Sequence, residues 1–449
     1  MDAVKHSLET HKKLLRWASL PEHTPAIGWI VRGEKMYWTP QNGVMDSRTY
    51  MKKNKKQPQS LYEIGSITKT MTALRLAQGE QDGLWQASDP LSKLVPELAD
   101  SEFARSVTLR QLATHTSGLA RLAKNQVKVS MQQNKANPYA AYFEQHLLQA
   151  VREESPRSGA KHGYSNYGYG LLGWALSRAS GITAPDALRR DLFDPLEMRG
   201  TVMPIVDDPQ ADNDAKSDRK ATVTSREAVP HSNGADPTEN TAAATSDSVV
   251  GSSAAVSDSA QATSSSAVAT LTRVPVATEV VEAPRPAPAA PSKSPGTILL
   301  PGFAPGGHPM PHWDFTSAMA GAGAVRSTLP DMLTYLEAQL GQHPSAASFE
   351  AALLACQHEQ ASVALSKGVG IGYAWMRSMR QDGTVTHWHN GATYGASSFM
   401  AFNRDLQSGF VILSNRGVSM MGQLKQMFGL GEMSTDRAAK LIGEALFNA

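Results

Sequence analysis

The sequence has a single cysteine, Cys356, among its 449 residues. This excludes a fold stapled by disulfides and is compatible with a reducing compartment. An excess of charge of one sign is also lacking, because 43 lysine and arginine residues face 41 aspartate and glutamate residues and give a formal net charge of +2. We therefore expect no nucleic-acid partner, since this balance provides no strong field.

Long hydrophobic runs are missing as well. Charged side chains interrupt residues 1–20, so no secretory segment is expected there, and no later stretch reaches the roughly 18 apolar residues needed to span a bilayer. We expect a protein without a membrane span that stays in the cytoplasm. A periplasmic location is expected only if an export segment precedes the sequence as written.

Aromatic residues are absent between Phe193 and Phe303, and residues 207–293 consist mainly of Ala, Ser, Thr, Pro, Asp and Val. Bulky apolar side chains are too few there to offset the ~1–2 kcal/mol per residue that ordering a chain costs. This composition predicts a disordered insertion with an extended proline-rich end at residues 284–295. The insertion is either a passive surface loop or an element that binds a proline-recognising protein partner.

Strand-like and helical patterns fill the rest of the chain. Two hairpins are expected, one near each end: residues 26–31 with 35–39 around a turn at Gly33-Glu34, and residues 397–402 with 409–413. Helical patterns occupy residues 7–17, 66–196 and 434–447. They predict an α/β fold of the α+β type, in which an antiparallel sheet built from both chain ends and flanked by helices adjoins a mainly helical lobe.

The insertion divides this expected fold in sequence but not in space. We expect an N-terminal helix within residues 1–24, followed by one domain of two lobes that combines residues 25–203 with residues 297–449.

Ser66 and Lys69 form the first candidate for catalytic chemistry. If a helix begins at Ser66, the ammonium group of Lys69 returns to the serine hydroxyl on the same face, and free backbone N–H groups at the helix start can stabilise an oxyanion. The alternative is an ordinary serine cap followed by a solvated lysine.

Tyr164 and Asn166 lie in a glycine-rich turn and can present a phenol and an amide side by side. A nearby ammonium group favours a phenolate, so we expect the pKa of Tyr164 to fall below about 10 and the tyrosine to accept the serine proton. The alternative is a surface turn rich in tyrosine.

A third candidate group precedes the second hairpin. If this segment forms a strand beside the serine, we expect His389 to line the site, Gly391 to leave room for substrate and the Ala392 N–H to act as a second oxyanion donor. His387 alternates with His389 as metal ligands do, but no third ligand is tied to them by local spacing, so packing is favoured over a metal. For His115 a turn-holding role is favoured over that of a base.

In chain order, the motifs Ser66-x-x-Lys69, Tyr164-x-Asn166 and His389-x-Gly391 resemble those of the class C β-lactamase-like branch of the penicillin-recognising serine hydrolases. Four further stretches resemble segments at the corresponding places of that family: residues 107–119, 194–200, 321–328 and 397–415. The resemblance covers nearly all of residues 25–446 except the insertion, and it implies a β-lactamase/DD-peptidase-like fold.

The resemblance also implies roles for these residues. Ser66 would attack a carbonyl to form an acyl-enzyme, and Lys69 and Tyr164 would transfer protons. Asn166 would orient Lys69 and the acyl side chain, and the N–H groups of Ser66 and Ala392 would hold the oxyanion. No metal or cofactor is implied, because protein groups supply both base and electrophile.

The third motif departs from the family pattern, which usually has Lys-Thr-Gly where this chain has His389-Asn390-Gly391. A histidine with a pKa near 6.5 is mostly neutral at about pH 7.5, so capture of a substrate carboxylate is weakened. We expect a serine hydrolase of a small ester, amide or peptide. The alternatives are a β-lactamase or D-alanyl-D-alanine carboxypeptidase and, in another class, a catalytically retired binding or scaffold protein.

Overall fold

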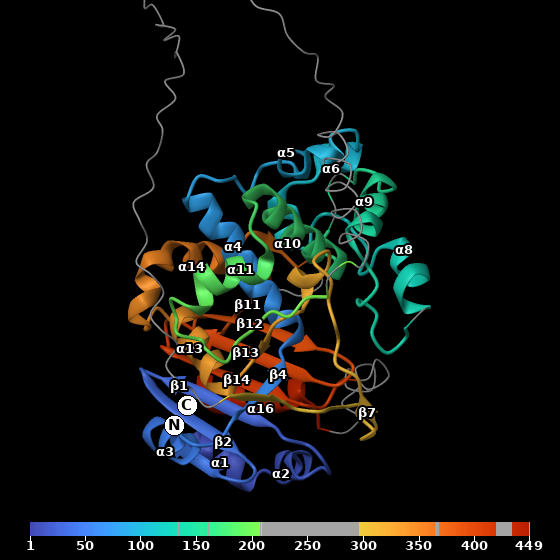
Figure 1. The fold of residues 1–449 in the computed structure, drawn as a ribbon. Coiled ribbons are helices and arrows are strands. Elements are labelled where there is room, and N and C mark those ends of the chain that lie inside the picture. The colour runs from blue at the N-terminus through green and yellow to red at the C-terminus, as the bar shows by residue number, and fades with distance from the viewer. Residues whose placement is uncertain are drawn as a thin grey trace, which may run out of the picture. The chain divides into compact units, whose positions relative to one another are not determined.

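The two ends of the chain meet in one antiparallel sheet (Figure 1). In the described part of the chain its nine strands have the order β3-β2-β1-β14-β13-β12-β11-β10-β9. They are β1 (Ala26–Val31), β2 (Glu34–Thr39), β3 (Gly43–Asp46), β9 (Ala361–Ser362), β10 (Val369–Ile371), β11 (Met376–Met379), β12 (Val385–Ala392), β13 (Ser397–Asn403) and β14 (Ser408–Ser414). Strand β1 pairs with β14, so the predicted α+β arrangement and both predicted hairpins are confirmed.

The computed structural model describes residues 1–132, 134–157, 159, 161–206, 208, 296–363, 368–418 and 433–448. These residues belong to one unit, Met1–Asn213 with Lys293–Ala449. The insertion expected at residues 207–293, with its proline-rich end, lies outside the described residues except for residue 208. The expected domain boundaries stay predictions.

The first hairpin turns at Arg32 and Gly33, one residue earlier than expected. Val31 pairs with Glu34, and the φ angles of Arg32 and Gly33 are 50° and 86°. Positive φ at both turn residues matches the twist of the two strands, and glycine adopts it without strain. Gly33 is therefore a turn residue, as expected, but it is the second residue of the turn and not the first.

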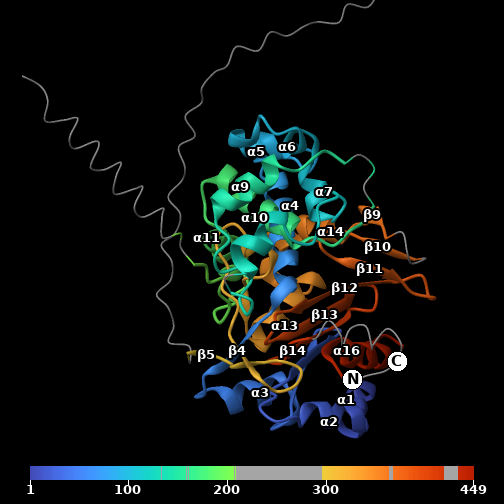
Figure 2. The same cartoon turned by 90° about the vertical axis from the view of Figure 1, so that its right-hand side faces the viewer.

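Helices cover both faces of the sheet (Figures 1 and 2). Helix α13 (Leu329–Gln339) packs against β1 and β14 on one face, where the methyl groups of Leu333 lie against the backbone of Gly28. On the other face, Ile27 and Trp29 of β1 join a core with α1 (Asp2–Thr10), α2 (Lys12–Ala18) and α16 (Thr435–Phe447). Side chains that alternate along β1 thus pack into two hydrophobic cores, one on each face of the sheet.

The N-terminal helix is broken into α1 and α2 at His11. This residue is extended, with φ −73° and ψ 101°, and its Nδ1 accepts a hydrogen bond from the Leu14 N–H at 3.3 Å. His11 is therefore the N-cap of a second helix, which apolar periodicity alone did not reveal.

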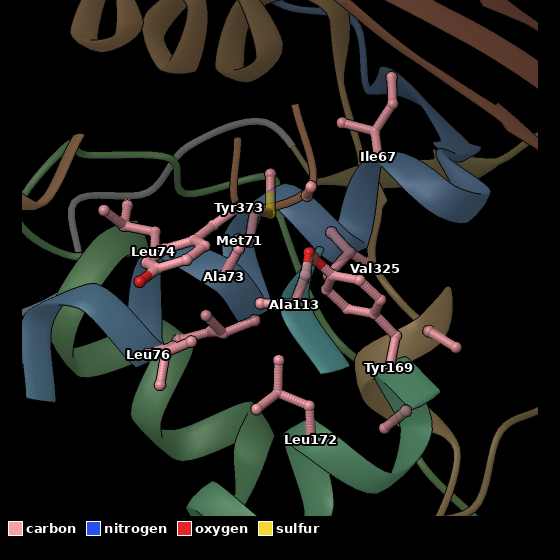
Figure 3. Packing of buried hydrophobic residues seen from close by; sticks show 14 of the residues in the cluster. Ile67, Met71, Ala73, Leu74, Leu76, Ala113, Tyr169, Leu172, Val325 and Tyr373 are labelled. Carbon is pink, nitrogen blue, oxygen red and sulfur yellow. The ribbon is translucent and has the colours of Figure 1, made fainter. Parts of the chain in front are cut away.

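The mainly helical lobe expected within residues 66–196 follows β4 (Gln59–Glu63), a strand that the sequence patterns did not predict. Its helices are α4 (Thr68–Gln81), α5 (Leu91–Leu94), α6 (Glu102–Ser106), α7 (Leu109–Ala113), α8 (Lys124–Gln126), α9 (Glu144–Arg152), α10 (Asn166–Ser180) and α11 (Ala184–Leu188). Helix α4 is buried along most of its length, and Figure 3 shows its side chains Met71 and Leu76 in one cluster with Tyr169 and Leu172 of α10. The burial of α4 fixes the position of this helix, which begins two residues after Ser66.

Short elements complete the described chain: α3 (Ser47–Asn54), β5 (Thr297–Leu299), β6 (Gly302–Phe303), β7 (Pro309–Met310), β8 (Arg326–Ser327) and α14 (Glu350–Gln357). Among the helices of the described residues, none has the length and apolarity that a bilayer crossing requires.

Candidate active site

Ser66 lies in a turn of 3-10 helix, Gly65–Ile67, between β4 and α4. The α-helix expected to begin at Ser66 begins two residues later, at Thr68. Gly65 has φ 50°, which lets the chain turn sharply from the strand into the 3-10 turn. Ser66 remains partly exposed, whereas Lys69 is completely buried.

The amino group of Lys69 lies between the serine and the backbone. Its Nζ is 2.9 Å from Ser66 Oγ and donates a hydrogen bond to the Ala322 carbonyl at 2.6 Å. Burial holds the pKa of Lys69 well below its usual 10.5, and the positive charge of Arg121 lowers it further. Loss of the proton leaves a lone pair next to the serine hydroxyl.

Tyr164 donates its phenolic hydrogen to Ser66 Oγ over 2.6 Å. The expected fall of the Tyr164 pKa is wrong, because burial raises the pKa to about 12, although the hydrogen bond with Ser66 and the charge of Arg121 oppose the rise. Lys69 Nζ lies over the ring, 5.0 Å from its centre. Desolvation therefore outweighs the nearby positive charges, and Tyr164 stays a neutral phenol.

His115 holds the loop that carries Tyr164. Its carbonyl accepts from the Gly163 N–H at 2.8 Å, its Nδ1 accepts from the Ser165 N–H at 3.1 Å, and its ring centre is 4.6 Å from that of Tyr164. Burial keeps the pKa of His115 well below 6.5. These contacts agree with the turn-holding interpretation.

Asn166 is the first residue of α10, directly after its N-cap Ser165. Its Nδ2 donates to the hydroxyl of Tyr139 at 2.9 Å, and no hydrogen bond to Lys69 is found between these two described residues. The buried Oδ1 of Asn166 has no hydrogen-bond partner in the described structure. It is the acceptor of the Asn166 side chain, and no described group uses it.

His389 lies on β12, whose C-terminal end contacts the Ser66 turn. Its side chain is 3% exposed, its Nδ1 faces the Asn390 carbonyl at 2.7 Å, and its ring centre is 6.4 Å from that of Tyr164. Burial, reinforced by the charge of Lys69, lowers the pKa of His389 to about 3. The imidazole is therefore neutral at physiological pH, as the sequence indicated.

Gly391 has a different purpose from the expected one. A Cβ atom there would lie 2.0 Å from the carbonyl oxygen of Ile64, so the missing side chain lets β12 approach the chain before Ser66 and does not open space for substrate. A Cβ on Gly65 would lie 2.7 Å from the nitrogen of Ala392. The Ala392 amide thus lies against the turn that carries Ser66.

Glu63 was missed by the sequence reasoning, although it directly precedes the Ser66 motif. This buried carboxylate accepts from the Thr393 hydroxyl at 2.8 Å and from the Trp313 N–H at 2.7 Å. Its partners lie 250 and 330 residues away in the sequence. No local spacing could reveal them.

Arg121 and a group of aromatic rings were missed for the same reason. The guanidinium carbon of Arg121 is 5.2 Å from the ring centre of Tyr164. The rings stack as Tyr139 on Phe315, with centres 4.6 Å apart, and edge to face as Trp313 with Tyr394, at 4.8 Å. Through Tyr139, the aromatic group reaches Asn166.

His387 packs in the core, where its Nε2 faces the Gln357 carbonyl at 3.0 Å and its ring stacks on Phe402. In the described part of the chain, no group of three or more His, Cys, Asp or Glu residues is arranged to hold a metal ion.

Comparison with known proteins gives relatives of low identity. The chain is 28% identical over 194 residues to a β-lactamase of Providencia stuartii, covering 43% of this chain and 45% of the relative. It is 30% identical over 168 residues to Penicillin-binding protein 4* of Bacillus subtilis (strain 168), covering 34% and 33%. The alignments thus span less than half the length of these curated relatives.

Solved structures resemble the fold over almost the whole length. A class C β-lactamase from Rhodobacter sphaeroides matches with a TM-score of 0.59 and 16% identity, covering 98% of each chain. The D-alanine carboxypeptidase AmpC from Burkholderia cenocepacia matches with a TM-score of 0.58 and 17% identity, covering 98% of this chain and 97% of that one. A sequence model of the Beta-lactamase family matches residues 26–427, well over half of the chain, and the chain therefore belongs to the β-lactamase family.

Proposed function

We propose that this protein is a serine hydrolase that cleaves a small ester, amide or peptide through an acyl-enzyme on Ser66. One observation carries the proposal: Ser66 Oγ lies 2.9 Å from a buried lysine amine of depressed pKa and 2.6 Å from a neutral phenol. A serine hydroxyl is a weak nucleophile until a neighbouring base takes its proton. Neutral Lys69 is that base.

The proton path follows from the two neutral partners. Lys69 accepts the Ser66 proton as Oγ attacks the carbonyl carbon. Tyr164 then gives its phenolic proton to the leaving group and is reprotonated by the Lys69 ammonium. The N–H groups of Ser66 and Ala392 stabilise the oxyanion, since both belong to the backbone segments that Gly65 and Gly391 bring together.

The acyl group is held next to the nucleophile and then released. The free Oδ1 of Asn166 accepts a hydrogen bond from the acyl part, and the aromatic group around Tyr139 packs against apolar portions of it. Water, activated by the same lysine and tyrosine, hydrolyses the ester on Ser66 and restores the free enzyme.

His389 bears on the class of substrate. In a cephalosporin the carboxylate is fixed to a rigid ring, and at β12 it would meet the buried, neutral imidazole of His389. We therefore expect a cephalosporin to be a poorer substrate than a simple ester. The names of the relatives, β-lactamase and penicillin-binding protein, keep β-lactam and D-alanyl-peptide cleavage as the alternative.

Ester and cephalosporin turnover by wild type and Ser66→Ala tests the proposal. We expect p-nitrophenyl butyrate to be cleaved with a higher kcat/KM than a chromogenic cephalosporin. The substitution should lower ester turnover at least about 10³-fold. Turnover that survives in Ser66→Ala contradicts the proposal. A fluorophosphonate probe that leaves Ser66 unmodified by mass spectrometry supports the rival reading, a retired binding protein.

A further inference from the structure

An exposed cation beside the site neither accepts nor donates a proton in the path above. The side chain of Arg121 is exposed, and its guanidinium carbon lies 5.2 Å from the ring centre of Tyr164. Among the residues that the structure describes, no carboxylate forms an ion pair with it. In contrast, Arg326 has Glu63 and Asp314 as partners. Arg121 is therefore available to a bound molecule.

The backbone holds Arg121 in this place. Its carbonyl accepts hydrogen bonds from the N–H groups of Asn166 at 3.0 Å and Tyr167 at 3.2 Å. The first N–H groups of a helix have no partner within the helix, so these bonds tie residue 121 to the start of α10. The same helix start presents Asn166, and the loop before it presents Tyr164. The base of the Arg121 side chain is thus positioned together with the catalytic candidates.

The charge of Arg121 reaches the centre of the site. It lowers the pKa of Lys69, and it opposes the rise of the Tyr164 pKa. Glu63, the carboxylate between the Ser66 turn and β12, is paired with Arg326 and accepts hydrogen bonds from Thr393 and Trp313, and no ion pair joins it to Arg121 among the described residues. A substrate at Ser66 therefore binds in a field that favours negative charge.

Strand β12 offers no competing cation. His389 is buried and neutral, and its Nδ1 is engaged by the Asn390 carbonyl. Guanidinium groups bind carboxylates through two parallel N–H bonds, a geometry that an exposed arginine can offer to an entering ligand.

We propose that Arg121 binds an anionic group of the substrate, so that the preferred substrates are esters or amides that carry a carboxylate on a flexible arm. This inference rests on the proposed hydrolase function, and it assigns charge recognition to the helical lobe and not to β12. Arg121 is then a specificity-determining residue that acts on substrate binding.

A matched pair of esters tests the proposal: mono-p-nitrophenyl glutarate, which carries a carboxylate, and neutral p-nitrophenyl butyrate. We expect Arg121→Gln to lower the ratio of kcat/KM for the anionic over the neutral ester about tenfold, mainly through KM, and Arg121→Lys to restore part of it. Added salt should raise KM for the anionic ester in wild type and much less in Arg121→Gln. Lys124→Gln, which removes an exposed positive charge on the neighbouring α8, is the control and should keep the wild-type ratio.

An unchanged ratio in Arg121→Gln overturns the proposal, and so does an equal fall in Lys124→Gln. Calorimetric binding of both esters to Ser66→Ala, with and without Arg121→Gln, separates this inference from the hydrolase function. A preference for the anionic ester that depends on Arg121 supports the inference even if wild type turns over neither ester. Equal affinities in the two variants contradict it.

Discussion

Burial drives both hydrogen-bonding partners of Ser66 toward a neutral state. The pKa of the Lys69 amine falls and the pKa of the Tyr164 phenol rises, in each case mainly because the charged form is desolvated. A pair of ammonium and phenolate, which the sequence pattern suggested, would place two charges where water cannot reach them. The neutral pair needs no such compensation, and it supports the proposal that Lys69 is the base.

The pH dependence of ester cleavage should report this lysine. We expect kcat/KM for neutral p-nitrophenyl butyrate to rise with pH along a limb whose midpoint lies below 10.5, because only the deprotonated Lys69 accepts the serine proton. The limb should move to higher pH in Arg121→Gln, since the arginine charge no longer disfavours the ammonium form. Initial rates across the pH range measure both.

His389 provides the control for that profile. Its pKa is about 3, so no inflection near 6.5 is expected from it. An inflection near 6.5 that disappears in His389→Gln, or a limb that stays in place in Arg121→Gln, would contradict the assignment.

Between elements, Glu63 joins the strand that precedes Ser66, the proposed nucleophile, to β12, which carries Ala392, the proposed second oxyanion donor. Its carboxylate at the end of β4 binds Thr393, the residue that follows Ala392 of β12. A second bond, from the Ser398 hydroxyl to the Ile64 carbonyl at 2.8 Å, ties β13 to the same segment. The distance between Ser66 and the Ala392 amide thus depends on side chains outside the three sequence motifs.

Glu63→Gln should lower kcat by about tenfold with little change in KM. Glutamine keeps only one acceptor oxygen, and its NH₂ group is itself a donor, so either the Trp313 N–H or the Thr393 hydroxyl loses its acceptor. The proposed oxyanion donors then lose their spacing. Breaking a buried hydrogen bond to a charged group also costs about 1.5–3 kcal/mol of unfolding free energy. Steady-state kinetics and urea unfolding measure the two effects.

Thr393→Val is the matched variant, because it removes the same contact from the end of β12 and keeps the shape of the side chain. It also removes the bonds that the Thr393 hydroxyl oxygen accepts from the N–H groups of Gly395 and Ala396. It should lower kcat in the same direction as Glu63→Gln. If both variants lose stability while kcat stays at the wild-type value, Glu63 has a structural role and does not position the oxyanion donors.

Local patterns predicted the elements well, and the contacts between elements much less. Periodicity and turn residues gave both hairpins, the helical lobe and the helix after Ser434, because these depend on neighbours in the sequence. The break at His11 and the rise of the Tyr164 pKa depend on capping geometry and burial, which the pattern does not contain. Glu63 and Arg121 meet their partners only through the fold, so no spacing could identify them.

Across the whole molecule, Asp331 links α13 to the chain that leaves the helical lobe. Its carboxylate accepts from the Gly200 N–H and from the Thr201 hydroxyl, each at 2.8 Å. Burial raises the pKa of Asp331 to about 6, although these hydrogen bonds oppose the rise. The folded protein therefore holds the Asp331 proton more tightly than the unfolded chain does, whose aspartate has a pKa near 3.8.

The sign of the resulting pH dependence follows from this difference. Below a pH of about 3.8 Asp331 is protonated in both states and its contribution to stability is fully present. Between about 4 and about 6 the unfolded chain loses the proton first, so the unfolding free energy falls as pH rises. A pKa difference of about 2 units corresponds to at most about 3 kcal/mol.

Asp331→Asn isolates this contribution, because an amide oxygen can accept the same two hydrogen bonds without ionising. Urea unfolding of wild type and variant should show the variant gaining stability relative to wild type as pH rises from about 4 to about 6, with a constant difference above about 7. Other titrating groups are common to both proteins and cancel in the difference. A difference that does not change with pH would show that the Asp331 carboxylate keeps an ordinary pKa when folded, and that its hydrogen bonds to Gly200 and Thr201 offset the cost of its burial.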